Sequence, residues 1–172
     1  MASFLINDTR KQLYHDAQTD PLENSARALA LKVLELGFTD EKYYRNSEFT
    51  VRTINGEVYR PDYVVMESVP AGIAPNRRGV VVVCDEVKTN IQTERQDEIA
   101  DEKMGDYGRA CLDYTPGQSI CFVTRQIGTK IRFWKYTRIN GLEDWGDDYL
   151  DVEDDWGEIM NRFAEMQAQN LF

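Results

Sequence analysis

The chain has 172 residues, of which 42% are hydrophobic and 29% are charged, and its formal net charge at pH 7 is −10. These values are typical of one globular domain that buries a sizeable core, so we expect a single domain over 1–172. The sequence also excludes a membrane-spanning protein, because it has no apolar run that is long enough to cross a bilayer. The N-terminus also lacks the apolar centre of a signal peptide, and we therefore expect an intracellular protein of the cytoplasm or nucleus with no membrane partner.

Cysteine and histidine are too few and too scattered for two common stabilising devices. The cysteines are Cys84, Cys111 and Cys121, with no CxxC pair, and His15 is the single histidine. Neither a disulfide framework nor a structural zinc site is therefore expected.

The negative charge is concentrated near the C-terminus. Residues 143–158 hold nine acidic and no basic side chains, which is most of the net charge. Since the remainder is close to neutral, the acidity does not exclude binding to nucleic acid. We interpret this acidic segment as a solvated loop anchored by Trp145, Tyr149 and Trp156. The alternative is an internal phosphate mimic that covers a basic groove and restrains activity.

The first predicted elements are two helices. A short helix is expected at 9–17. A longer one is expected at 21–36, where Asp20 and Pro21 are typical of a helix start and apolar residues recur every three or four positions.

Three strands follow. The segments 48–54 and 57–66 flank the Asn55-Gly56 dipeptide, which is a strong signal for a hairpin turn. The segment 80–88 opens with four consecutive valines, and this β-branched density favours a buried strand.

The rest of the chain is predicted to form a helix, a hairpin and a helix. The polar helix contains Gly105 and Gly108, which are weak points for helix formation. The expected ranges are a helix at 91–114, strands at 119–124 and 130–136, and a C-terminal helix at 156–169.

Two of the predicted strands carry residues suited to a divalent cation. Asp62 lies at the mouth of an apolar segment, and Glu86 and Lys88 close the strand at 80–88. Because side chains alternate along a strand, Glu86 and Lys88 share one face and Asp85 takes the other. Two carboxylates beside a lysine suit a hard cation and a phosphodiester.

The pair Pro61-Asp62 and Glu86-Val87-Lys88 resembles the motif of the PD-(D/E)XK nuclease superfamily. Triplets at 40–42 and 101–103 have the same pattern in polar surroundings, but only the triplet at 86–88 closes an apolar strand. The predicted order, α-β-β-β-α-β-β, matches the core of that superfamily. We therefore expect an α/β, restriction-endonuclease-like core over about 20–138, with a mixed central sheet flanked by helices and a C-terminal helix.

Within the superfamily, the chain looks most like the N-terminal nuclease domain of type I restriction enzyme motor subunits. The matching stretches are RPDYVV, VVVCDEVK, a helix with Tyr107, a strand ending FVT and the strand KIRFWKY. One position departs from that family. The family often has a glutamine four residues before the helix tyrosine, whereas this chain has Lys103 four residues before Tyr107.

The resemblance implies a nuclease that depends on Mg²⁺ or Mn²⁺ and hydrolyses nucleic acid, with DNA favoured over RNA. Asp62 and Glu86 would hold the metal together with the backbone carbonyl of Val87, and Lys88 would position or deprotonate the attacking water. The superfamily often adds a carboxylate from its first helix to the metal site. Here that residue is Glu23, which is equally suited to cap its own helix, and both roles stay open.

Four residues are candidates for substrate binding, and each has a structural alternative. Arg77 and Arg78 lie on the loop between the motif strands, where exposed arginines also serve solubility. Gln92 follows the motif closely but is also typical of a polar strand exit. Tyr107 could stack near the site, and the alternative is a position in the core.

A catalytically inactive module of the same fold, which binds nucleic acid or protein within a larger complex, is the alternative function. The intact Asp62, Glu86 and Lys88 favour an enzyme, whereas the acidity and Lys103 favour the module. The sequence has no Walker-type phosphate loop, so a motor would have to come from a partner. The expected partners are nucleic acid and a larger protein complex that supplies recognition.

Overall fold

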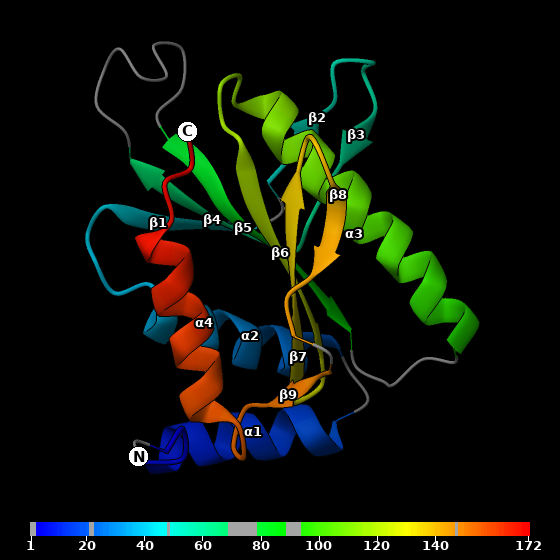
Figure 1. The fold of residues 1–172 in the computed structure, drawn as a ribbon. Helices are drawn as coiled ribbons and strands as arrows, with labels where there is room; N and C mark the ends of the chain where they lie inside the picture. Colours follow the sequence, from blue (N-terminus) through cyan, green and yellow to red (C-terminus); the bar gives the residue numbers. More distant parts are fainter. Residues whose placement is uncertain (1–2, 21–22, 48, 69–78, 89–93, 147) are drawn as a thin grey trace.

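The computed structural model describes residues 3–20, 23–47, 49–68, 79–88, 94–146 and 148–172, and within these ranges a mixed seven-stranded sheet carries helices on both faces (Figure 1). The helices are α1 (Asp8–Thr19), α2 (Glu23–Gly37), α3 (Glu94–Tyr114) and α4 (Trp156–Ala168). The strands of this sheet are β1 (Tyr43–Ser47), β4 (Tyr63–Ser68), β5 (Gly79–Lys88), β6 (Ile120–Ile127), β7 (Lys130–Thr137), β8 (Gly141–Asp144) and β9 (Leu150–Asp151). A separate two-stranded sheet consists of β2 (Val51–Arg52) and β3 (Val58–Tyr59). Within the same ranges, none of the helices combines the length and the hydrophobicity needed to span a membrane.

The strand order in the large sheet is β1-β4-β5-β6-β7-β8, with β9 also paired to β7. The pairing of β5 with β6 is parallel, and the other pairings are antiparallel. This mixed topology needs a crossover between β5 and β6, and α3 provides it on one face of the sheet. The protein thus has the expected α/β fold, compatible with a restriction-endonuclease-like core.

Both faces of the central strands are buried. Val65 of β4 and Phe122 of β6 belong to the core cluster formed with α2 and α4, while their neighbours Val64 and Val123 belong to the cluster formed with α3. All four side chains are fully buried. Strands covered on both faces have continuous apolar sequences, which explains why these segments were predictable.

The two N-terminal helices are confirmed. The α1 helix begins after Asn7, whose side-chain oxygen accepts a hydrogen bond from the Arg10 N–H at 3.0 Å. The predicted apolar stripe of α2 faces the core, with Leu29 and Val33 fully buried. The helix ends at Gly37, where an added Cβ would lie 2.4 Å from the ring of Phe163.

The prediction for the first hairpin is only partly right. The Asn-Gly turn exists, with Gly56 at a φ of +86°, but it joins the short strands β2 and β3 outside the main sheet. In the main sheet β4 lies between β5 and β1, and β1 is a strand that the sequence analysis missed. The sequence of β1, YYRNS, is polar and mostly half-buried, so backbone pairing with β4 stabilises it rather than an apolar pattern.

The later elements follow the prediction, and the two glycines leave α3 unbroken. Gly108 is required by packing: a Cβ at this position would lie 2.4 Å from the side chain of Tyr136 in β7. The helix can therefore approach the sheet closely at this point.

The prediction that the acidic segment forms a loop is correct for residues 145–146, 148–149 and 152–155, but not where the segment enters two short strands. It contributes to β8 and β9, which both pair with β7 because that strand has a free edge beyond β6. The expected aromatic anchoring is confirmed for Trp145, which stacks on Phe122 with ring centroids 4.9 Å apart, and for Trp156, which is buried.

Candidate active site

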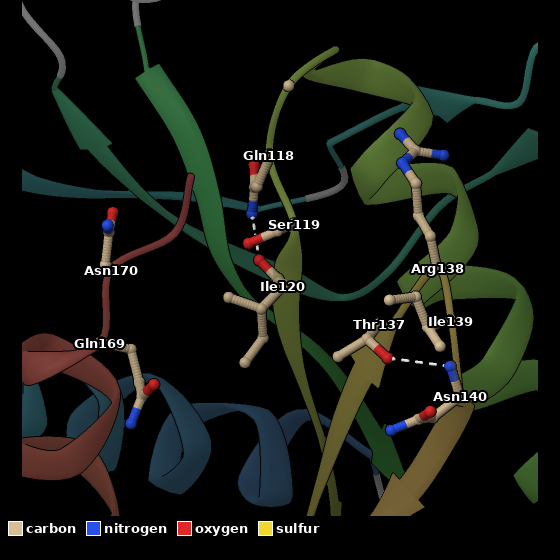
Figure 2. A pocket seen from close by; sticks show the side chains of 10 residues that line it. Gln118, Ser119, Ile120, Thr137, Arg138, Ile139, Asn140, Gln169 and Asn170 are labelled. Carbon is tan, nitrogen blue, oxygen red and sulfur yellow. Dashed lines mark hydrogen bonds between the residues drawn. The ribbon is translucent and has the colours of Figure 1, made fainter.

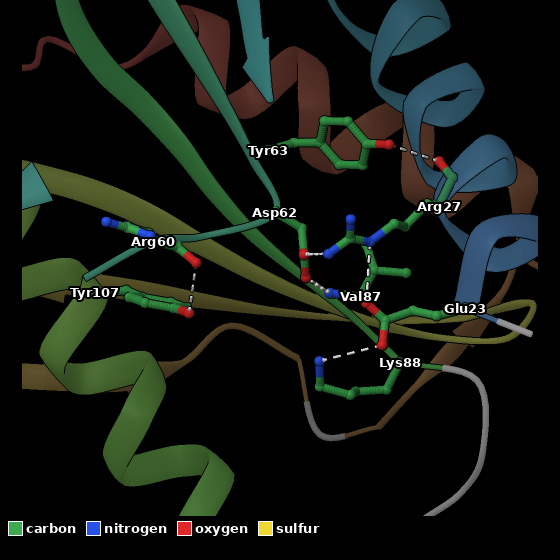
Figure 3. A network of polar contacts seen from close by, with 8 residues as sticks. All are labelled: Glu23, Arg27, Arg60, Asp62, Tyr63, Val87, Lys88 and Tyr107. Carbon is green, nitrogen blue, oxygen red and sulfur yellow. Dashed lines mark hydrogen bonds and ion pairs between the residues drawn. The ribbon is translucent and has the colours of Figure 1, made fainter. Parts of the chain in front are cut away.

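The two sequence motifs meet at one end of the sheet. The antiparallel register of β4 and β5 pairs Tyr63 with Asp85, so the next step along both strands places Asp62 opposite Glu86. The Asp62 carboxylate accepts a hydrogen bond from the backbone N–H of Val87 at 2.8 Å (Figure 3). This bond links the aspartate of the first motif to the central residue of the second.

The α2 helix adds two charged side chains to this end of the sheet. Arg27 forms an ion pair with Asp62, and its Nε donates a hydrogen bond to the Glu23 carboxylate at 3.0 Å. The other carboxylate oxygen of Glu23 lies 3.9 Å from Nζ of Lys88. Asp62, Arg27, Glu23 and Lys88 therefore form a chain of alternating charges, which we call the charge chain (Figure 3).

The guanidinium of Arg27 is strongly held in its charged form. Burial alone would lower its pKa, but the neighbouring charges of Asp62 and Glu23 oppose this, and the pKa is raised above the ordinary value. The backbone of Arg27 is also fixed, because the hydroxyl of Tyr63 donates to its carbonyl oxygen at 3.2 Å. This hydrogen bond ties α2 to the first residue of β4.

Lys88 lies at a strand end that is firmly held. Its carbonyl oxygen accepts a hydrogen bond from the Gly128 N–H at 2.8 Å, in the turn between β6 and β7. Gly128 has a φ of +56°, in the left-handed region that glycine adopts without strain. The turn thus fixes the backbone from which the Lys88 side chain extends.

Tyr107 is a buried residue of α3 that stabilises the segment before Asp62. Its side chain is 1% exposed, and its hydroxyl donates to the carbonyl oxygen of Arg60 at 3.3 Å. At this burial, Tyr107 holds the segment that leads into Pro61-Asp62 and offers little surface to a substrate. Nζ of Lys103 lies 5.3 Å from the centroid of the Tyr107 ring.

A cavity of about 400 Å³ opens beside Asp62. It is lined by Arg27, Thr50, Arg60, Pro61 and Asp62, so two arginines border the candidate metal ligand. This composition suits an anionic group close to the charge chain.

A larger cavity of about 660 Å³ lies at the start of β6 (Figure 2). The candidate site lies at the other end of that strand, where Lys88 pairs with Ile127. Amide and hydroxyl groups line the larger cavity together with Ile120, Arg138 and Ile139, and no carboxylate, histidine or lysine is among its lining residues. The described lining of this cavity therefore offers no carboxylate ligand to a divalent cation.

The donors at the candidate site fit a hard divalent cation. Asp62, Glu23 and the Glu86 position provide only oxygen ligands, which favour Mg²⁺ or Mn²⁺ over zinc. Among the side chains that the structure describes, no three His, Cys, Asp or Glu residues lie close enough together to hold a metal. The Glu86 side chain lies outside that described set. The candidates Arg77, Arg78 and Gln92 also lie outside the described residues.

Two arginines near the motifs escaped the sequence analysis. Arg27 had a usable signal, because it follows Glu23 by four residues and both must lie on one face of a helix. Arg125 had none. It is 2% exposed, pairs in register with Glu86 across the parallel strands and donates to the Tyr149 hydroxyl at 3.2 Å.

Comparison with known proteins gives a likeness of fold. No protein-family model matches the sequence, and no curated protein matches it. Among solved structures, a chain in the cryo-EM structure of a DrdV–DNA complex is similar, with a TM-score of 0.56 and 16% sequence identity. The similarity covers 90% of this chain and 92% of that chain. At this level of identity the likeness establishes a shared fold.

Proposed function

We propose that the protein is a metal-dependent nuclease that hydrolyses phosphodiester bonds in nucleic acid, with DNA favoured over RNA. The observation that carries the proposal is the hydrogen bond between the Asp62 carboxylate and the Val87 N–H, which joins the two motifs. The similarity in fold to a chain of a DNA complex supports DNA as the partner.

Three residues of the charge chain, Asp62, Glu23 and Lys88, have tasks in this reaction. Asp62 and Glu23 offer carboxylate oxygens to the cation, and the Glu86 position offers another. Lys88, beside Glu23, would hold the attacking water and offset the negative charge of the transition state. A bound Mg²⁺ or Mn²⁺ would supply Lewis-acid neutralisation of the phosphate.

One observation favours the alternative, a non-catalytic module that binds nucleic acid. Arg27 already neutralises Asp62, and a permanent ion pair there would leave no cation site. The cavity lined by Arg27 and Arg60 could still bind a phosphate in such a module.

The two functions separate in a cleavage assay. Labelled single- and double-stranded DNA and RNA are incubated with the wild type in Mg²⁺, Mn²⁺ or EDTA, alongside Asp62→Ala and Lys88→Ala. We expect cleavage that requires the metal and falls at least about 100-fold in both variants, because each removes a group needed at the transition state.

The matched controls are Glu67→Ala and Lys42→Ala. Glu67 and Lys42 form an ion pair of 2.8 Å at the opposite end of β4. The two control substitutions therefore remove one negative and one positive charge at a place distant from the candidate site. Cleavage that survives Asp62→Ala would refute the assignment. Binding without cleavage in every metal would favour the module.

A further inference from the structure

We propose that Arg27 is an exchangeable counter-ion for Asp62. While no cation is bound, Arg27 neutralises Asp62; a cation that binds Asp62 releases the guanidinium, which then binds a phosphate group of the nucleic acid in the adjacent cavity. This inference rests on the proposed function, because it concerns the order in which that site takes its metal and its substrate.

The competition follows from the surroundings of Asp62. The side chain is 9% exposed, and its two oxygens are engaged by the Val87 N–H and by Arg27. A carboxylate at this burial needs a neutralising partner to stay charged. A cation bound to the oxygen that contacts Arg27 would meet a like charge, so the two partners exclude each other.

Arg27 can leave while α2 stays in place. Its side chain is 34% exposed, and its second partner, Glu23, is more exposed still. The backbone at Arg27 is held independently by the Tyr63 hydroxyl. Only a change of side-chain rotamer is therefore needed for the exchange.

A destination for the guanidinium lies next to Asp62. Arg27 lines the cavity of about 400 Å³ together with Thr50 and Arg60. A planar guanidinium donates two parallel hydrogen bonds to a phosphate, and the charge of Arg60 strengthens the attraction. Metal and nucleic acid should therefore bind cooperatively, and each should raise the affinity for the other by the same factor.

Metal affinity can be measured without any catalytic turnover. Mn²⁺ is titrated by calorimetry into the wild type, Arg27→Met and Arg27→Gln in the absence of nucleic acid. We expect Mn²⁺ to bind about tenfold more tightly to Arg27→Met, because the competing charge is gone. Arg27→Gln keeps a hydrogen-bond donor for Asp62, so it tests the same point if Arg27→Met folds poorly.

Arg60→Met is the matched control. It removes the same charge from the lining of the same cavity, but the Arg60 side chain points away from Asp62 (Figure 3). Its Mn²⁺ affinity should stay within about twofold of the wild type.

The second measurement concerns nucleic acid. Binding of a fluorescent phosphorothioate DNA oligonucleotide is followed by anisotropy with Mn²⁺ and with EDTA. In the wild type Mn²⁺ should raise the affinity about tenfold, and in Arg27→Met this gain should disappear.

The outcomes separate this inference from the proposed function. If the wild type binds Mn²⁺ but neither Arg27 variant binds it more tightly, the exchange is refuted and the nuclease proposal stands. The exchange is also refuted if Mn²⁺ binds more tightly but its gain in DNA affinity persists in Arg27→Met. If none of the proteins binds Mn²⁺, both proposals fail.

Discussion

Replacement of Gly108 by alanine tests how closely α3 approaches the sheet, and Gly105→Ala is a matched control in the same helix. A Cβ at Gly108 would lie 2.4 Å from Cβ and Cγ of Tyr136, whereas at Gly105 the nearest atom, Cβ of Leu142, would be 4.0 Å away. Since ordinary van der Waals contact begins near 3.4 Å, the Tyr136 side chain would have to retreat by about 1 Å.

The two substitutions should change the free energy of unfolding in opposite directions. Alanine is favoured over glycine in a helix interior by about 1 kcal/mol, so Gly105→Ala should raise the free energy of unfolding by about 0.5–1 kcal/mol. At Gly108 the same gain is opposed by an overpacking cost of about 1–3 kcal/mol. We expect a net loss of up to about 2 kcal/mol, measured by urea unfolding followed by circular dichroism.

Equal stability of Gly108→Ala and Gly105→Ala would refute this reasoning. A third protein identifies the cause: adding Tyr136→Gly to Gly108→Ala removes both the Cβ and the ring that the new methyl group meets. If the clash is responsible, the double variant should recover part of the lost stability relative to the sum of the single effects.

Two further predictions concern tyrosines that join distant parts of the chain. The Tyr14 hydroxyl donates to the Asp151 carboxylate at 2.9 Å, and burial together with this bond raises the pKa of Tyr14 to about 12. The neutral form is thus favoured in the folded state, so the contribution of Tyr14 to stability is intact below pH 10 and is lost as the pH rises towards 12. In Tyr14→Phe, the decline in the free energy of unfolding between pH 9 and pH 11 should be about 1 kcal/mol smaller, and an unchanged decline in urea unfolding would contradict this. Tyr107→Phe removes the hydrogen bond to the Arg60 carbonyl and should lower the free energy of unfolding by about 0.5–1.5 kcal/mol, whereas wild-type stability would show that this bond contributes nothing.

Much of the fold follows from local sequence patterns. The valines of β5, the apolar stripe of α2 and the apolar runs of β6 and β7 are sequence signals of burial, and the apolar residues of α2, β6 and β7 pack against the core. Because hydrophobic burial stabilises these elements wherever they pack, their apolar patterns predict them without knowledge of their neighbours. The two motifs were also visible, since each closes or opens an apolar strand.

Other features depend on neighbours that are distant along the chain. β1 is a strand because β4 offers it a partner, and β8 and β9 pair with the open edge of β7. Tyr107 lies in the core because α3 crosses behind the segment that carries Arg60.

The charge chain shows the same division. The sequence by itself determined that Asp62 and Lys88 stand at strand ends and that Glu23 and Arg27 share a helix face. Only the tertiary structure decided that Arg27 pairs with Asp62, because ion pairs form between groups that folding brings within a few ångströms. The sequence alone does not indicate which opposite charge a given side chain will contact in the folded protein.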